Sequence, residues 1–516
     1  MSRISTVTFG LFFLVGAGLT LAAGFFMNFH AAGNDIWSPL YYGRHISLAQ
    51  PESLYNGFYP IGYSFLIGQF PYSYAIQLAY LLNALFVGLL TACIKSLVST
   101  TRSLTSILLA FIFSVLLPLI FVNANTVGPD IGAAAFTACA IYLLWIDPLT
   151  RNKDSHSYLK SGLTGLCLGL AVLWRNHAIV SSIVILVIYL LMTGSVPLRH
   201  KLMLAGVFIA ICSFQVFANL YSGHGPFETA QNFNIYKLFH GVDWTNPPAP
   251  AEIEGFSLWT LLLANPSEFF QAYYPWFIYL ATFAWPGLTC VVLSPWKSPT
   301  SRFGIFTSAT ILIYSIPLSL GDSLRAPLTT IALYIAPLGI SFSLFLAKIR
   351  DGTGNQKWVG NVSAFGILTA CAFTAYGWFQ SDWDLIKSNR AEHKIFLNVE
   401  QTLIGRGMIS PTQVFSDRLD FYLPNQPPYL PRQIEGFFYY WVWGYSREYP
   451  RIQNESWESF ASDCRAQGIK FLVVSPNAGY RGDYFLPIYS GDVDPEENGL
   501  SFIAQRGNFR IYQFKE

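Results

Sequence analysis

The chain has 516 residues, of which 53% are hydrophobic and only 12% are charged, and its mean hydropathy is positive. This balance excludes a disordered protein and a nucleic-acid-binding protein, and it is typical of a protein with many membrane spans. The formal net charge of +2 says little as a total, so its distribution along the chain matters more. The cysteines show no metal-type spacing with histidine, and six of the seven lie in apolar stretches where a buried hydrophobic role is expected.

Apolar segments of about spanning length recur along most of the chain. A helix needs about 20 apolar residues to cross a bilayer, so the pattern predicts a polytopic α-helical membrane protein with about 11 transmembrane helices. The first segment follows Arg3 as in a signal peptide, but it has full spanning length and no clean cleavage pattern, so we expect it to be retained. The segments are 7–27, 75–94, 104–122, 130–146, 161–174, 178–193, 202–221, 274–294, 303–320, 327–347 and 358–378.

The loops between these segments differ in their basic residues. If the N-terminus is cytoplasmic, the outer loops of the membrane part hold only four basic residues, which are Arg44, Arg175, Lys237 and Arg325. The other Lys and Arg residues of this part then lie inside. Positive residues favour the cytoplasmic side, so the distribution predicts a cytoplasmic N-terminus and an extracytoplasmic C-terminal part.

The first outer loop, residues 28–74, contains a helix signal. Ser38 followed by Pro39 predicts a helix over 39–48, with the serine as its N-cap. Tyr41, Arg44 and His45 recur on one side of this helix at helical spacing. They are candidates for contact with a substrate at the membrane surface.

Two acids mark the outer side of the membrane part. Asp35 stands alone just before the surface helix, where it is a general base toward a hydroxyl, a ligand of a divalent cation, or an acceptor of backbone hydrogen bonds in the turn. Asp130 opens the fourth span, where a carboxylate also interacts favourably with the helix dipole. Two acids facing one cavity would make a reaction centre or a metal pocket, and the sequence leaves these alternatives open.

The fifth and sixth segments are each too short to span a bilayer alone. We predict two short helices that meet at residues 174–177, with Arg175 and His177 below the outer membrane surface. An ionisable residue at such depth is by default a functional candidate, and the alternative is an arginine that snorkels from a helix end.

The composition changes abruptly after residue 378. Residues 1–378 are predicted to form the membrane domain, with outer loops 28–74 and 222–273, and residues 379–516 a small extracytoplasmic α/β domain. Its expected helices cover 391–404 and 456–467, the second capped by Ser456 and stopped by Gly468. Its expected strands cover 413–415, 469–475 and 509–514.

The order of these features resembles the GT-C superfamily of membrane glycosyltransferases, which use polyprenyl-phosphate-linked sugars. The nearest likeness is to bacterial relatives of the protein O-mannosyltransferases and to the aminoarabinose lipid A transferases. The family usually has an acidic pair in the first outer loop where this chain has Asn34-Asp35, which favours a base role for Asp35 over a metal site. The matching features are Asp35, the family's tyrosine-proline segment at Tyr59-Pro60-Ile61-Gly62-Tyr63, Asp130, and Arg175 on short central helices.

The resemblance implies an enzyme of the bacterial inner membrane that transfers a sugar from a polyprenyl-phosphate donor to a lipid, glycan or protein acceptor on the outer face. Asp35 would activate the acceptor hydroxyl, and Arg175 with Arg325 would hold the donor phosphate, since departing phosphate charge needs a cation. Asp130 would assist, or bind a divalent cation together with Asp35 if one is used. The expected partners are the donor and membrane lipids, with no nucleic acid. The candidate substrate-binding residues are Tyr41, Arg44, His45, Tyr59 and His177.

Three other classes of protein are possible alternatives. A flippase or transporter should have internal repeats and polar residues in mid-membrane, and the chain shows neither. A ligase or polymerase of polyprenyl-diphosphate glycans is not separable from the transferase by these residues. A sensor with the C-terminal domain as its receptor leaves Arg175 and the acidic outer loops without a role.

Overall fold

The computed structural model describes most of the membrane part and most of the C-terminal part of the chain. The described residues are 3–30, 36–50, 53–55, 57–71, 74–98, 128–150, 158–192, 196–229, 236, 262–318, 326–350, 354–418, 421–426, 452, 456–476 and 482–515. The expected span at 104–122 and most of the loop 222–273 therefore lie outside them.

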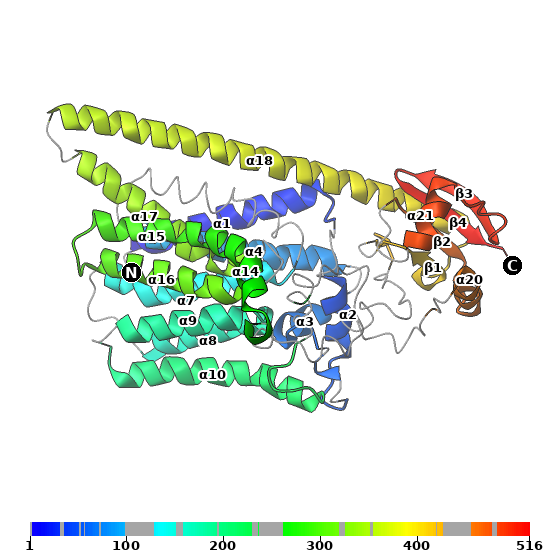
Figure 1. Ribbon diagram of the computed structural model, residues 1–516, viewed down its shortest axis with the longest axis horizontal. Helices are drawn as coiled ribbons and strands as arrows, with labels where there is room; N and C mark the ends of the chain where they lie inside the picture. Colours follow the sequence, from blue (N-terminus) through cyan, green and yellow to red (C-terminus); the bar gives the residue numbers. More distant parts are fainter. Residues whose placement is uncertain are drawn as a thin grey trace.

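Long, roughly parallel and antiparallel helices form a bundle at one end of the molecule, and a small sheet lies beyond its other end (Figure 1). The helices of the bundle are α1 (Arg3–Phe26), α4 (Ala75–Val98), α7 (Asp130–Thr150), α8 (Tyr158–Trp174), α9 (Ala178–Met192), α10 (Leu198–Tyr221), α14 (Pro266–Ala281), α15 (Trp285–Leu293), α16 (Pro299–Leu318) and α17 (Ile331–Arg350). Short 3-10 segments, η4 (Thr282–Ala284) and η5 (Ala326–Thr330), precede α15 and α17.

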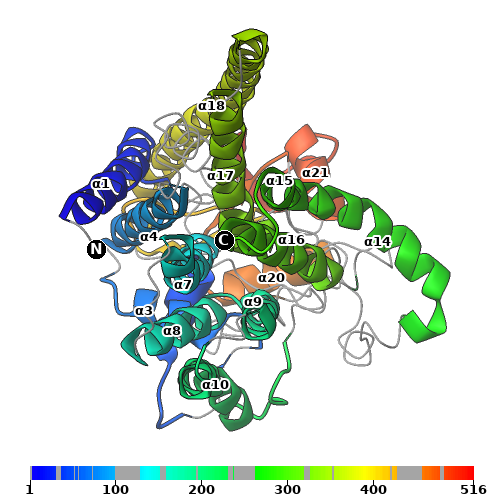
Figure 2. The ribbon, with the colours of Figure 1, turned by 90° about the vertical axis from the view of Figure 1, so that its left-hand side faces the viewer.

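Helix α7 is enclosed by its neighbours. Figure 2 shows it in the middle of the bundle, with α4, α8, α9, α16 and α17 around it. Its sequence permits this position, because the run 132–135 and the alanines at 138 and 140 are small and let other helices approach closely. Ala133, Ala134 and Ala138 are fully buried.

Helices α1 and α10 present apolar side chains outward. Val7 and Leu14 on α1 and Leu202 and Ile209 on α10 are more than half exposed, as expected where a protein faces lipid. Among the described residues, four helices are long and apolar enough to cross a membrane, at Thr6–Phe26, Ala75–Val98, Leu198–Tyr221 and Leu328–Lys348. These coincide with four of the expected spans, while the total of about 11 remains a prediction.

The surface helix begins earlier than its sequence indicates. Helix α2 covers Trp37–His45 with Ile36 at the N-cap, so the prediction that Ser38 caps the helix is wrong. The backbone N–H of Leu40 donates to the carbonyl of Ile36, and both side chains are buried. Burial of these two side chains outweighs the local capping preference of serine. Helix α3 (Ile61–Gly68) crosses α2 closely. The close approach needs glycine at position 43, since a Cβ there would overlap the Ser64 carbonyl.

Helix α18 (Gly354–Gly405) is one continuous helix of 52 residues. It includes both the expected span at 358–378 and the expected helix at 391–404. In Figure 1 it runs along the bundle and ends beside the sheet. It passes through the proposed domain boundary at 378 without interruption.

The C-terminal part contains a four-stranded sheet in the order β1-β2-β4-β3. Its strands are β1 (Val414–Ser416), β2 (Phe471–Val474), β3 (Leu500–Arg506) and β4 (Phe509–Phe514), its helices are α20 (Trp457–Ala466) and α21 (Gly482–Ser490), and η6 (Pro411–Gln413) precedes β1. Strands β1 and β2 are parallel. Parallel strands need a long crossover connection, and the connection between these two contains α20. Ser456 caps α20 as expected, and the left-handed Gly468 follows its end.

Candidate functional site

An ion pair lies at the end of the bundle where α7 begins and α8 ends. Asp130 is the first residue of α7, and Arg175 directly follows α8. These two helices are consecutive and antiparallel, so the start of one lies beside the end of the other. The Nε atom of Arg175 is 3.0 Å from Oδ1 of Asp130, and the two side chains are only 13% and 4% exposed.

Both charges suit their positions on the helices. A carboxylate is favourable at the N-terminus of α7, and a guanidinium is favourable at the C-terminal end of α8. The Nη1 atom of Arg175 is buried and has no hydrogen-bond partner among the residues that the structure describes. The charge of Asp130 therefore holds the guanidinium close to it, while neither Nε nor Nη1 of Arg175 donates a hydrogen bond to the described protein groups.

The turn that carries Arg175 is held from several sides. Its backbone N–H donates to the carbonyl of Ala171, and its carbonyl accepts from the N–H of Ala178, the first residue of α9. The side chain of Asn176 donates to the carbonyl of Phe58 over 3.2 Å. Because Phe58 belongs to the first outer loop, this bond ties that loop to the turn.

The first outer loop is also held by the end of α10. The backbone N–H of Tyr55 donates to Oγ of Ser222, and that of Ile61 donates to Oε1 of Gln215. The Tyr55 side chain is buried, which raises its pKa to about 12, so the phenol is neutral at physiological pH. These contacts position residues 53–61 beside the ion pair.

A second polar group joins α1, α18 and the C-terminal part. We call it the junction cluster, and it consists of His30, Glu392, His393, Arg418 and Tyr422. Nδ1 of His30 lies 2.8 Å from the Tyr422 hydroxyl, and its Nε2 lies 3.0 Å from Oε2 of Glu392. Glu392 also pairs with Arg418 at 2.7 Å, and the Tyr422 hydroxyl lies 2.9 Å from Nδ1 of His393.

The junction cluster perturbs its titratable groups. Burial raises the pKa of Glu392, but the hydrogen bond with His30 and the charge of Arg418 outweigh it and hold that pKa below its ordinary value. Burial, with the nearby His30, lowers the pKa of His393 to about 4. No local sequence pattern connects the members of this cluster, because His30 is 392 residues from Tyr422.

The predicted site residues are only partly within the described structure. Asp35 and Arg325 lie outside the described residues, as do the side chains of Tyr41 and His45, although α2 includes both backbones. Their roles remain predictions. The residues that the structure does bring together are Asp130 and Arg175.

The other three candidates have defined surroundings. Arg44 is exposed, and its guanidinium donates to the carbonyl of Phe70, just beyond α3. Tyr59 is buried, and its ring packs edge-on against Phe58. His177 follows Arg175 by two residues, and its Nε2 is buried without a hydrogen-bond partner among the described residues.

A divalent cation remains a prediction. Within the described ranges, no three His, Cys, Asp or Glu side chains are grouped so that they could hold a metal ion. Asp35 lies outside those ranges, so a site formed with it is not covered by this finding.

Solved structures share this arrangement of elements, while no protein-family model and no curated protein matches the sequence. ArnT from Cupriavidus metallidurans bound to undecaprenyl phosphate aligns over 98% of this chain and 97% of its own, with a TM-score of 0.54 and 16% identity. ArnT in the apo state aligns over 96% and 97%, with a TM-score of 0.53 and 15% identity. ArnT is a glycosyltransferase of the GT-C superfamily. The chain has the GT-C fold.

The predicted resemblance is therefore confirmed at the level of the fold, and the apolar helices together with this fold make the chain an integral membrane protein. The archaeal oligosaccharyltransferase AglB from Archaeoglobus fulgidus, solved with an inhibitory peptide and a dolichol-phosphate, is a weaker match. It aligns over 96% of this chain and 74% of its own, with a TM-score of 0.46 and 11% identity.

Proposed function

We propose that the chain is a glycosyltransferase that moves a sugar from a polyprenyl-phosphate donor to a lipid, glycan or protein acceptor. The observation that carries the proposal is the buried Arg175, fixed by Asp130 and with Nη1 not used by any described protein group, at one end of a GT-C bundle. The fold supports the reaction class because ArnT, a transferase of the same fold, has been solved with undecaprenyl phosphate bound.

Arg175 would bind the donor phosphate. In the reaction the acceptor hydroxyl oxygen bonds to the anomeric carbon of the sugar, the bond from that carbon to the phosphate oxygen breaks, and the electron pair leaves with polyprenyl phosphate. Negative charge then builds up on the departing phosphate. A guanidinium already oriented in a poorly solvated position stabilises this charge without reorganising, which is the usual basis of electrostatic catalysis.

The proton of the acceptor hydroxyl would pass to Asp35. The first outer loop supports this assignment, because it is tied to the Arg175 turn by Asn176 and to α10 by Tyr55 and Ile61. Asp130 would then act as a positioning residue for Arg175, and Arg325 would be a second ligand of the phosphate.

The proposed location is the bacterial inner membrane, with the N-terminus in the cytoplasm and the Asp130–Arg175 pair toward the outer side. The support is the distribution of Lys and Arg, which places the basic loops on the side of the N-terminus. The C-terminal sheet lies beyond the end of the bundle that carries the pair, so it would be extracytoplasmic (Figure 1).

Binding of undecaprenyl phosphate to the purified chain tests the phosphate site. We expect saturable binding that is at least about tenfold weaker in Arg175→Ala, since charge-assisted contacts to a buried phosphate are worth more than 1.4 kcal/mol. Arg302→Ala is the matched control, because Arg302 is exposed at the start of α16 and takes no part in the proposed site. Equal binding by the Arg175→Ala protein and the wild type would contradict the proposal.

The base is tested separately. We expect Asp35→Asn to bind undecaprenyl phosphate like the wild type, and to transfer no sugar from undecaprenyl-phosphate-linked hexoses or pentoses to acceptors in a membrane extract. Retained transfer by this variant would remove the base role from Asp35 and leave the phosphate site unaffected.

A further inference from the structure

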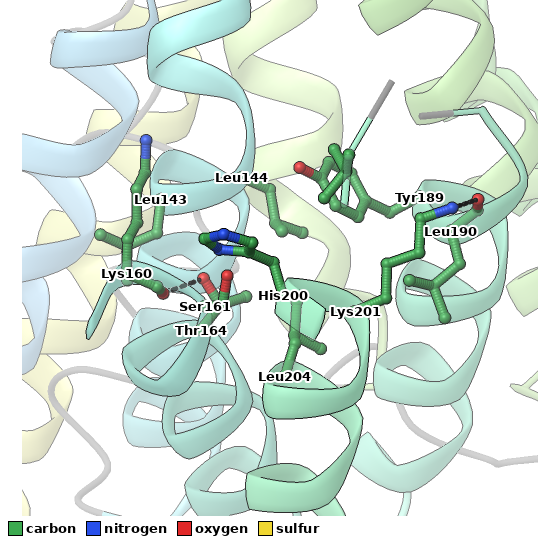
Figure 3. Close-up of a pocket in the computed structure, with 11 residues that line it drawn as sticks. Leu143, Leu144, Lys160, Ser161, Thr164, Tyr189, Leu190, His200, Lys201 and Leu204 are labelled. Carbon is green, nitrogen blue, oxygen red and sulfur yellow. Dashed lines mark hydrogen bonds between the residues drawn. The ribbon is translucent and has the colours of Figure 1, made fainter. Parts of the chain in front are cut away.

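A basic pocket lies at the end of α8 opposite to Arg175, where α8 and α10 begin and α9 ends (Figure 3). It is a small hollow that is partly open to the outside. Helix α8 has 17 residues and is therefore about 25 Å long, so the pocket and the ion pair are separate sites. The polar residues that line it are Lys160, Ser161, Thr164, Tyr189, His200 and Lys201, and no acidic residue lines it within the described part of the chain.

His200 indicates that the pocket has a ligand. Its side chain is buried, with 5% of the residue exposed, and its Nδ1 atom has no hydrogen-bond partner among the described residues. Figure 3 shows its ring within the pocket, near Ser161 and Thr164. Stacking on Tyr158, with centroids 4.6 Å apart, fixes the ring plane but gives the nitrogen no partner. A buried polar atom without a partner is costly and rare, so a bound group that contacts it is expected.

The charge around the pocket is positive. Lys160 and Lys201 line it from two different helices, and the guanidinium of Arg199 lies over the Tyr158 ring at 5.3 Å. The N-termini of α8 and α10 add the partial positive charge of two helix dipoles. Nζ of Lys201 donates to the carbonyl of Leu190 over 3.2 Å, which uses one of its three protons and holds the ammonium at the rim. This arrangement selects an anion.

The surface beside the pocket is apolar and faces outward. Leu159 on α8 and Leu198 and Leu202 on α10 are 71%, 70% and 62% exposed. In an integral membrane protein such side chains contact lipid acyl chains. The ligand that fits both features has an anionic head for the pocket and an apolar tail for the leucines.

We propose that this pocket binds the phosphate of an anionic phospholipid headgroup in the leaflet on the side of the N-terminus. His200 and Ser161, which lie near each other in Figure 3, would contact the phosphate oxygens, and Lys160 and Lys201 on either side would attract the anion by their charge. A free phosphate ion shares this chemistry but makes no use of the exposed leucines. The proposal does not depend on the glycosyltransferase function, because the pocket lies at the other end of the bundle from the proposed donor site.

Lipid binding to the full-length chain tests the proposal. The protein is stripped of lipid in a neutral detergent, and phosphatidylglycerol, phosphatidylcholine or inorganic phosphate is added while bound species are counted by native mass spectrometry. We expect saturable binding of phosphatidylglycerol, and binding about tenfold or more weaker in Lys160→Gln/Lys201→Gln, because a basic residue near a membrane surface contributes about 1 kcal/mol toward an anionic lipid.

The matched control is Lys297→Gln/Lys348→Gln. It removes the same charge from two exposed lysines that do not line the pocket and that are predicted to lie on the same side of the membrane. We expect it to bind phosphatidylglycerol like the wild type. Ser161→Asp provides a variant that keeps both lysines, and the added carboxylate should weaken binding to a similar extent, whereas Ser161→Asn should not.

Three results would overturn the proposal. The first is unchanged binding of phosphatidylglycerol by both pocket variants, each eluting as a single folded species in size-exclusion chromatography. The second is equal binding of phosphatidylcholine, which would show that the net negative charge is not recognised. The third is displacement of phosphatidylglycerol by inorganic phosphate at millimolar concentration, which would identify a free-anion site instead of a lipid site.

Discussion

The two ends of α8 carry cationic groups in different settings. At one end Arg175 is paired with Asp130 and both side chains are largely buried. At the other end Lys160, His200 and Lys201 line a pocket in which the described residues include no acidic side chain. A paired and buried guanidinium has one fixed direction, which suits the stabilisation of charge in a transition state. A pocket lined by basic side chains attracts anions by its charge, which suits the retention of a lipid.

Breaking the Asp130–Arg175 pair should have the largest effect on stability. Asp130→Asn leaves the guanidinium of Arg175 buried without a countercharge, and we expect it to lower the free energy of unfolding by about 3 kcal/mol. The double variant Asp130→Asn/Arg175→Gln removes both charges and should recover most of the loss. Thermal unfolding in detergent measures both. A double variant no more stable than the single one would show that the pair does not act as a unit.

Arg175→Lys keeps the positive charge beside Asp130 and removes the planar arrangement of N–H donors that a guanidinium has. We expect it to lower the rate of sugar transfer by about 10²-fold, with a smaller effect on unfolding than Asp130→Asn has. Initial rates with an undecaprenyl-phosphate-linked sugar in proteoliposomes check this, and Arg302→Lys serves as the control. A normal rate in Arg175→Lys would mean that the site at Arg175 needs only a positive charge, as the Lys160–Lys201 pocket does.

Salt should separate the two ends. Exposed charges are screened by ions, whereas a largely buried pair is screened much less. Raising the ionic strength from about 0.05 M to about 0.5 M should therefore weaken phosphatidylglycerol binding at the Lys160–Lys201 pocket several-fold, and undecaprenyl phosphate binding at Arg175 by less. Parallel titrations of both lipids at the two ionic strengths make the comparison. Equal salt dependence would contradict the contrast between the two sites.

The junction cluster adds the smallest effect, a dependence of stability on pH. The pKa of His393 is about 4 in the folded chain, below its ordinary value of 6.5, so the unfolded chain binds more protons between these values. Stability should fall as the pH falls from 6.5 toward 4, and His393→Gln should reduce this slope. Melting temperatures at pH 7 and pH 5 measure it.

Asp417 has the opposite sign and serves as a counter-test. Burial raises its pKa to about 7, from an ordinary value of 3.8, although its carboxylate accepts the backbone N–H of Ser475. The folded chain therefore binds more protons than the unfolded chain between pH 3.8 and 7, and stability from this group rises as the pH falls. Asp417→Asn should steepen the acid loss that His393→Gln reduces. Parallel slopes in the two variants would contradict these assignments.

The sequence by itself determined the local features of this protein. Apolar periodicity and length predicted the helices of the bundle, and the break at 174–177 separated α8 from α9. Serine followed by an amphipathic run predicted α20, and alternating or continuous apolar runs predicted β2 and β4. Each of these signals lies in the spacing of side chains within one helix or strand, so the sequence of that segment alone predicts the element.

Only the tertiary structure decided which residues meet. It paired Asp130 with Arg175, joined His30 to Tyr422 across 392 residues, and formed a pocket from the ends of three helices. It also placed the start of α2 at Trp37, because burial of Ile36 and Leu40 outweighs the capping preference of Ser38. Such contacts depend on how distant elements pack, and packing energies exceed the small local preferences that a sequence pattern records.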